Sequence, residues 1–151
     1  MSDFVARLQA FLQSRNKPSS YQQLTPDAST REYFRVEWGT ETAIVCIYPE
    51  PFIAREQSYL DVTDLFLRSG LPVAPILDFD ESLGAITIAD FGDRILREEL
   101  LSSDHERREE LIDAAIDLIP KIQAATKTAF ELNSIASRLK FDVEKLTWEL
   151  N

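Results

Sequence analysis

Apolar residues recur at helical spacing near the start of the chain, which predicts an amphipathic helix there. Phe4, Leu8 and Phe11 fall on one face. This helix is expected to end before Pro18, because proline cannot continue the hydrogen-bond ladder. The same spacing returns over 54–69, and a Ser-Gly pair marks the end of that second predicted helix.

Between and after these helices, polar and apolar positions alternate in the manner of β-strands. In the segment "REYFRVEW", Phe34, Val36 and Trp38 share one face, which indicates a strand with one buried side. The segment "TAIVCIY" is apolar and rich in β-branched residues, as in a strand buried on both faces. Five strands are predicted, within 21–24, 31–38, 42–48, 71–80 and 84–89.

After Arg94 the periodicity is helical. A short helix is expected over 95–101, and the capping-box spelling at 103–106 predicts the start of a longer helix that Pro120 kinks. Asp142 can cap a last helix. This order predicts an α+β protein with a mainly antiparallel five-stranded sheet, helices packed on it, and further helices after it.

Net charge and composition exclude several classes of binding partner and metal site. The 151 residues carry a formal net charge of −10, which repels the phosphates of nucleic acids and the anionic surfaces of membranes. Cys46 is the one cysteine, which excludes a disulfide within the chain. Because His105 is the one histidine, a zinc site made of Cys and His ligands is also hard to build. We expect a cytoplasmic protein with no nucleic-acid or membrane partner.

A stretch of small polar residues between two predicted strands points to phosphate recognition. In "LTPDASTREYFRV", a hairpin turn lets backbone N–H groups and the hydroxyls of Ser29 and Thr30 approach phosphate oxygens. A plain turn with local hydrogen bonds is the alternative. The stretch resembles the phosphate-loop hairpin of the aminoglycoside phosphotransferase-like kinases, in particular the N-acetylmuramate and N-acetylglucosamine kinases, although Pro26 replaces the usual glycine. The matching positions are Asp27, Ala28, Ser29, Arg31, Tyr33, Phe34 and Arg35.

The tripeptide Asp-Phe-Gly at 90–92 has the same sequence as the magnesium-binding motif of protein kinases, but the residues that precede it differ. In protein kinases a catalytic loop with a histidine precedes that motif, and no histidine precedes it here. The surrounding "ITIADFGDRIL" instead resembles the strand, hinge and helix run of the aminoglycoside phosphotransferase-like family. The resemblance implies a kinase-like small lobe over 1–89, a hinge over 90–94 and the first, incomplete part of a helical large lobe over 95–151.

The same resemblance implies an adenine site at this hinge. The carbonyl of Ala89 and the N–H of Phe91 would hold the base, Ile88 and Phe91 would form apolar walls, and Cys46 would face the ring. A strand-to-helix turn that binds nothing is the alternative. Together with the hairpin, the implied nucleotide-binding residues are Asp27, Ala28, Ser29, Thr30, Arg31, Cys46, Ile88, Ala89, Asp90 and Phe91.

Groups that phosphoryl transfer requires are missing from the sequence. The third strand of this family should offer a lysine to the phosphates, and Tyr48 stands in its place, so Arg31 or Arg35 could serve them instead. Neither an H-x-D catalytic loop nor a later magnesium aspartate is present. We therefore expect the N-terminal, nucleotide-binding part of a kinase, inactive alone, with the Mg²⁺ ligands outside this chain. Such a part would expose apolar residues around Ile122, Leu146 and Leu150.

The intact enzyme would transfer the γ-phosphoryl group of ATP or GTP, with Mg²⁺, to a hydroxyl of a small molecule, and an amino sugar is the acceptor that the resemblance implies. Two other functions stay open from the sequence. One is a catalytically inactive nucleotide-binding or pseudokinase module. The other is an acidic interaction domain that uses the predicted helix at 104–126 as its partner surface.

Overall fold

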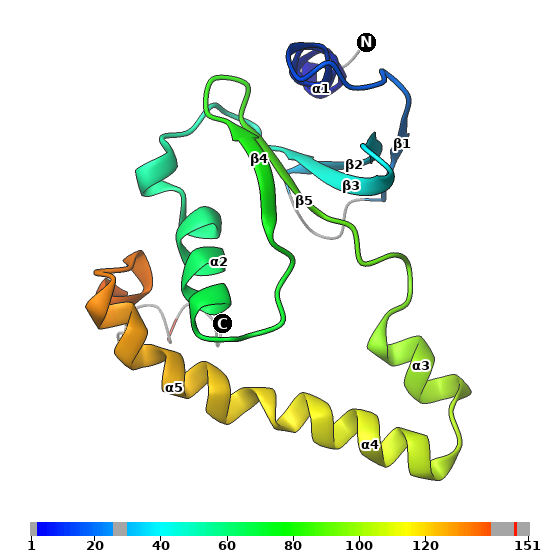
Figure 1. The fold of residues 1–151 in the computed structure, drawn as a ribbon, viewed down its shortest axis with the longest axis vertical. Helices are drawn as coiled ribbons and strands as arrows, with labels where there is room; N and C mark the ends of the chain where they lie inside the picture. Colours follow the sequence, from blue (N-terminus) through cyan, green and yellow to red (C-terminus); the bar gives the residue numbers. More distant parts are fainter. Residues whose placement is uncertain (1–2, 26–29, 140–146, 148–151) are drawn as a thin grey trace.

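An antiparallel sheet of five strands organises the first ninety residues (Figure 1). The computed structural model describes residues 3–25, 30–139 and 147. The strands lie side by side in the order β1-β2-β3-β5-β4, so the predicted α+β class and antiparallel five-stranded sheet are confirmed. Their bounds are β1 Tyr21–Gln23, β2 Glu32–Trp38, β3 Glu41–Ile47, β4 Ile76–Asp80 and β5 Ala85–Ala89.

Helix α1 (Asp3–Ser14) covers one face of the sheet and builds the core with it. Leu8, Phe11 and Leu12 are fully buried, because their spacing of three, four and one residues places them on the same helix face. They pack against every second residue of β2 and β3, since successive strand residues point to opposite faces. The buried strand residues of this cluster are Phe34, Val36, Ala43, Val45, Ile47 and Ala85.

The predicted helix over 54–69 is interrupted near its start. It consists of a 3-10 turn, η1 (Ala54–Glu56), followed by helix α2 (Ser58–Arg68). Gln57 separates the two because its backbone is extended, and its side-chain oxygen accepts a hydrogen bond of 3.3 Å from the Tyr59 N–H at the start of α2. Helical spacing alone gave no sign of this break, since Gln57 is a good helix former.

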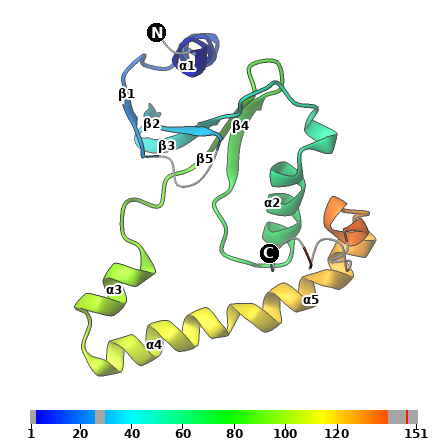
Figure 2. The same ribbon diagram turned by 180° about the vertical axis from the view of Figure 1, so that it is seen from behind.

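The chain continues in helices after the sheet, and the long helix predicted there is divided. Asp104, rather than Ser103, caps it, accepting a hydrogen bond of 2.9 Å from the Arg107 N–H. The helix is interrupted at Asp117 because Pro120 lacks the N–H that would bond four residues back. Figure 2 shows the two halves as one long rod. The bounds are α3 Leu96–Ser102, α4 His105–Ile116, α5 Leu118–Glu131 and η2 Ile135–Arg138, and the last helix expected at Asp142 lies outside the described residues.

The end of this rod docks on α2. Ala125 and Ala129 of α5 are buried there. The carboxylate of Asp61 on α2 accepts hydrogen bonds from the Ser134 hydroxyl and, at 2.9 Å, from the Ile135 N–H. Helix α2, which lies between β3 and β4 in the chain, is thereby fixed to the helical segment that follows the sheet.

The rest of the rod leaves apolar side chains exposed. Ile122 is 46% exposed, and Leu146 and Leu150, which were expected to share its surface, lie outside the described residues. Within the described ranges, none of the helices has the length and apolar character that crossing a membrane requires. The exposed apolar residues of α4 and α5 include Ile112, Ile116, Ile119 and Phe130.

Gly84→Ala is expected to destabilise the fold more than Gly39→Ala. Both glycines have positive φ, +62° and +76°, so both alanines would carry the cost of left-handed backbone, about 1 kcal/mol. Only at Gly84 would the new Cβ meet backbone, 2.8 Å from the Glu50 carbonyl oxygen; nothing lies within 4 Å at Gly39. We expect Gly84→Ala to lose about 1–3 kcal/mol more in urea unfolding, and equal losses would contradict this packing.

Candidate ligand-binding site

The face of the sheet opposite α1 carries an enclosed pocket. Tyr33 and Cys46 point to this face because their strand neighbours point into the core under α1. Tyr59 of α2 also contributes, so the pocket lies between the sheet and that helix. Its volume is about 150 Å³, and its lining consists of Arg31, Tyr33, Cys46, Tyr48, Tyr59, Ile86 and Ile88.

Strand pairing arranges the side chains of this face in three rows. Partners across neighbouring strands share a face, and successive rows are two residues apart along each strand. The Tyr48 N–H donates a 2.8 Å hydrogen bond to the Gly84 carbonyl, which extends the pairing beyond the end of β3. Starting at the end of β5, the rows are Arg35, Ile44 and Ile88; then Tyr33, Cys46 and Ile86; then Arg31 and Tyr48.

The pocket therefore changes character along the strands. Its end beside the last residues of β5 is apolar, with Ile88 and Ile86, and its far end carries the guanidinium of Arg31. Neighbouring rows are about 6.6 Å apart along the strands, so the two ends of the pocket, which are two rows apart, are separated by about 13 Å. A ligand that matches both ends has a flat apolar part and an anionic part.

Arg31 is held by two aromatic rings at the far end. Its Nη1 donates to the Tyr48 hydroxyl at 3.3 Å, and the guanidinium carbon lies 5.7 Å and 5.4 Å from the ring centres of Tyr33 and Tyr48. Burial raises the pKa of Tyr48 and of Tyr59. Both phenols therefore keep their protons at neutral pH and can donate hydrogen bonds.

Cys46 forms the apolar floor of the pocket. Burial raises the pKa of its thiol to about 11, and the nearby charge of Arg31 offsets only part of this effect. A protonated thiol is a poor nucleophile and a poor metal ligand. Cys46 can therefore contact a ligand ring, as predicted, but it has no sign of a chemical role.

The last residue of β5 presents main-chain groups beside the pocket. The Ala89 N–H donates a hydrogen bond of 3.1 Å to the Pro75 carbonyl. In an antiparallel pair the N–H of the opposite residue would in turn donate a hydrogen bond to the Ala89 carbonyl. The opposite residue here is Pro75, and proline has no N–H. The Ala89 carbonyl therefore lacks its ladder partner, and among the described residues the Phe91 N–H donates no hydrogen bond.

Phe91 itself does not form the apolar wall that the sequence predicted. Its side chain is 70% exposed and is absent from the pocket lining. Gly92 follows it with a φ of +80°, so the chain turns sharply here and carries the ring away from the sheet. After β5 the Ala89 carbonyl thus lies without its ladder partner, and the Phe91 ring does not contribute to the pocket lining.

Asp90 has a structural position rather than a ligand-facing one. Its carboxylate is 5% exposed and accepts hydrogen bonds from Arg35 Nε at 2.6 Å, the Thr42 hydroxyl at 2.7 Å and the Gly92 N–H at 2.9 Å. Burial opposes ionisation, but these donors outweigh it and hold the pKa of Asp90 below its usual value. Asp93 is a second carboxylate on Arg35, at 2.7 Å.

The pocket brings together part of the predicted site. Arg31, Cys46 and Ile88 line it, and Ala89 follows directly. Thr30 is exposed, and Asp27, Ala28 and Ser29 lie outside the described residues. Sequence reasoning did not assign the remaining lining residues to the site: Tyr33, Tyr48, Tyr59 and Ile86. Alternation with Cys46 could have indicated the two strand tyrosines, but nothing local could have indicated Tyr59.

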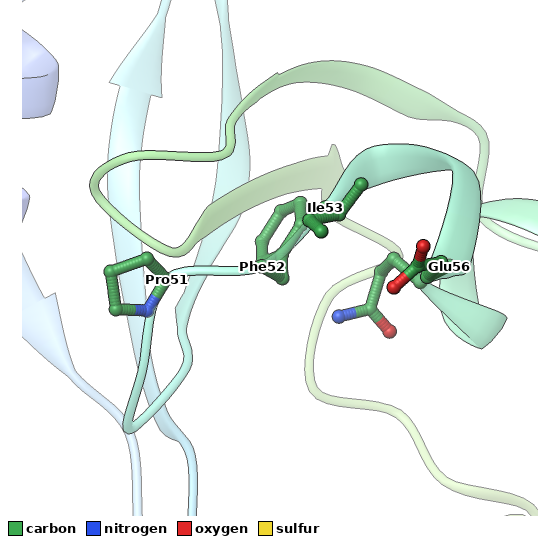
Figure 3. A pocket seen from close by; sticks show the side chains of 5 residues that line it. Pro51, Phe52, Ile53 and Glu56 are labelled. Atoms are coloured by element: carbon green, nitrogen blue, oxygen red, sulfur yellow. The ribbon is translucent and has the colours of Figure 1, made fainter.

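A larger and more open hollow of about 460 Å³ lies at the loop before α2 (Figure 3). Its lining comes from one short segment, with Pro51, Phe52, Ile53, Glu56 and Gln57. Since no second element contributes a polar group, nothing converges on a ligand there. In the part of the chain that the structure describes, no group of three or more His, Cys, Asp or Glu side chains could hold a metal ion.

Comparisons with protein-family models, with curated proteins and with solved structures give no match to this chain. The resemblance to the aminoglycoside phosphotransferase-like kinases therefore stays a prediction from two sequence motifs.

Asp90→Asn is expected to destabilise the protein by about 1–3 kcal/mol at pH 7, because the half-buried guanidinium of Arg35 loses the buried one of its two carboxylate partners. The depressed pKa of Asp90 also fixes the pH dependence. Its ionised form contributes stability above the unfolded-state pKa, and this contribution is lost as pH falls through the lower folded-state value. The difference between wild type and variant should therefore shrink below about pH 4.

Urea unfolding at pH 7 and at steps down to pH 3 measures this difference. Asp93→Asn is the matched control, since that carboxylate also contacts Arg35 but is 82% exposed, and exposed ion pairs contribute little. A loss for Asp93→Asn as large as that for Asp90→Asn, or a pH-independent difference, would contradict the assignment.

Proposed function

We propose that this chain is the nucleotide-binding part of a small-molecule kinase of the aminoglycoside phosphotransferase type. Residues 1–89 are its small lobe, 90–94 its hinge and 95–151 the first helices of its large lobe. The observation that carries the proposal is the graded pocket on the sheet, apolar beside Ala89 and cationic at Arg31. A base and a phosphate chain are the two parts of one ligand that match these ends.

The base is proposed to bind at the hinge end. Ile86, Ile88 and Cys46 supply a flat apolar surface, the Ala89 carbonyl accepts a hydrogen bond from an amino group, and the Phe91 N–H donates to a ring nitrogen. Ligand pockets usually measure about 300–1,000 Å³, so the 150 Å³ pocket encloses only part of a nucleotide.

The reaction of the intact enzyme is proposed to be transfer of the γ-phosphoryl group of ATP or GTP to a hydroxyl, with an amino sugar as acceptor. Such transfer depends on positioning, on Mg²⁺ and on a base that takes the hydroxyl proton. The magnesium ligands and the base are expected in polypeptide outside this sequence. The 151 residues alone are expected to bind nucleotide without appreciable transfer, and binding without transfer by the intact protein would favour the pseudokinase alternative.

A partner-binding role has one observation in its favour. Ile112, Ile116 and Ile119 are 41–54% exposed along α4 and the start of α5, beside many acidic residues. Apolar side chains in such a row are usually covered by another surface. In the kinase proposal that surface is the remainder of the large lobe, whereas an acidic interaction domain would present it to a separate protein.

Ile88→Trp is expected to weaken binding of Mg-ATP at least about tenfold, measured by calorimetric titration, because the indole would fill the hinge end of the pocket. The half-buried position of Ile88 gives the larger ring room to be accommodated without unfolding the sheet.

Leu77→Trp is the matched control. Leu77 is a 43% exposed residue of β4 outside the pocket lining, so the same ring added there should leave the affinity unchanged. Folding of both variants is checked by circular dichroism. A wild-type chain that is folded and releases no heat with Mg-ATP or Mg-GTP would rule out the nucleotide proposal.

A further inference from the structure

Helix α4 contributes no buried residue to the described part of the structure. A helix of 12 residues is marginal in water unless tertiary packing supports it. The apolar side chains of α4 instead lie exposed in a row that continues into α5. Ile112, Ile116 and Ile119 are 41%, 54% and 54% exposed, and Phe130, further along, is 66% exposed. Exposed apolar rows of this kind mark contact surfaces.

The row follows the spacing of a coiled-coil seam. Its positions are 112, 116, 119, 123, 126 and 130, separated by alternating steps of four and three residues. Asp117, between the two helices, keeps right-handed helical backbone angles, φ −63° and ψ −17°, so the spacing continues across the junction. At 1.5 Å per residue the row is about 27 Å long on the rod that Figure 2 shows. We call these six exposed side chains the seam: Ile112, Ile116, Ile119, Gln123, Thr126 and Phe130.

Helix α2 covers another side of the rod. Ala125 and Ala129 are the residues of α5 that are buried there. Each lies one position before a seam residue, which corresponds to about 100° around the helix. The seam can therefore meet a second surface while α2 stays in place.

The charges along the rod differ between its two halves. Helix α4 has four acidic and two basic residues, whereas α5 has one acidic and two basic residues. A second rod that runs in the opposite direction sets the acidic α4 of one copy beside the basic α5 of the other. A parallel rod would set α4 beside α4, with like charges together. The charge pattern therefore favours an antiparallel pair of identical chains.

Pairing about a two-fold axis at position 121 aligns the seam with itself. Position 112 then meets 130 of the other copy, and 116 meets 126, as a self-complementary interface requires. Asp113 of one copy lies between these two layers and faces Lys127 of the other copy. Within the described residues Asp113 has no ion-pair partner, and Lys127 has only an exposed contact of 3.7 Å with Glu131. The symmetry forms the pair of opposite charges twice.

The net charge of the chain does not prevent this association at physiological salt. Each chain carries a formal net charge of −10. In about 0.15 M salt, repulsion between exposed charges more than about 8 Å apart is largely screened. The apolar seam and the charge pairs beside it act at contact distance, so association is measured at that ionic strength.

We propose that the seam is the interface of an antiparallel homodimer, oriented by Asp113 of each copy against Lys127 of the other. The proposal goes beyond nucleotide binding and is independent of it, since none of the seam residues lines the pocket on the sheet. For the chain of 151 residues, a second copy supplies both the apolar row and the opposite charges that match the seam.

The mass of the full chain in solution tests the homodimer. Light scattering and sedimentation equilibrium are recorded from about 1 to about 200 µM protein, which covers weak and standard interfaces. We expect the mass to rise with concentration from 17.2 kDa towards twice that value. Ile116→Asp should weaken association at least about tenfold, because the dimer would bury an unpaired charge.

Leu101→Asp is the matched control for Ile116→Asp. Leu101 is a 78% exposed residue of α3 outside the seam, so the same charge placed there should leave the mass unchanged. Ile116 is itself 54% exposed in the single chain, so aspartate there should not unfold it. Circular dichroism verifies that both variants are folded.

Charge reversal tests the antiparallel arrangement. Asp113→Lys and Lys127→Asp each create two like-charge contacts in the homodimer, and each should weaken it at least about tenfold. A mixture of the two variants should associate more tightly than either alone, because one chain then carries lysine at both positions and the other carries aspartate. The double variant D113K/K127D should recover the association of the wild type.

A chain that stays monomeric and folded over this range overturns the homodimer and leaves the nucleotide proposal standing. A dimer as strong in Ile116→Asp as in the wild type overturns the assignment of the interface to the seam. Equal association in the mixture and in the single variants overturns the antiparallel arrangement. If the wild-type chain is monomeric but binds a synthetic amphipathic helix of leucine and lysine, and Ile116→Asp does not bind it, the row serves a separate protein and the homodimer is overturned.

Discussion

The pairing of β3 with both β2 and β5 is the constraint on which the rest of this structure depends. Because side chains alternate across a strand, this register sends Phe34 and Val45 into the core under α1 and Tyr33 and Cys46 to the opposite face. One slip of a single residue would exchange the two sets. The hydrophobic core and the pocket are therefore two consequences of the same hydrogen-bond ladder.

The contact between Arg35 and Asp90 links that ladder to the helices. Asp90 is the first residue after β5, and its buried carboxylate ties the chain back to β2 through Arg35 and to β3 through Thr42. The exit from the sheet is thereby fixed, with the Ala89 carbonyl beside the pocket and Phe91 turned outward. The same contact holds the guanidinium of Arg35 between two carboxylates, those of Asp90 and Asp93.

Much of the fold followed from local patterns, and less of the site did. Helix α1, strands β2 and β3 and the glycine after α2 were predicted because their signals lie within a few residues. The break at Gln57 was missed because no local feature opposes a helix there. The direction in which the Phe91 ring points, away from the pocket, depends on tertiary packing that the sequence pattern does not contain. Tyr59 was missed since only packing of α2 brings it to the sheet.

Local sequence patterns were sufficient for the α+β class, for the alternation that creates two distinct sheet faces, and for the charge that each residue carries. Packing of distant segments set which arginine lies between Asp90 and Asp93 and which one lines the pocket, because both lie on one face of the sheet and differ in the residues that approach them. It also decided that the Ala89 carbonyl stands opposite a proline. Such facts depend on partners far apart in the chain, which periodicity and local propensity do not encode.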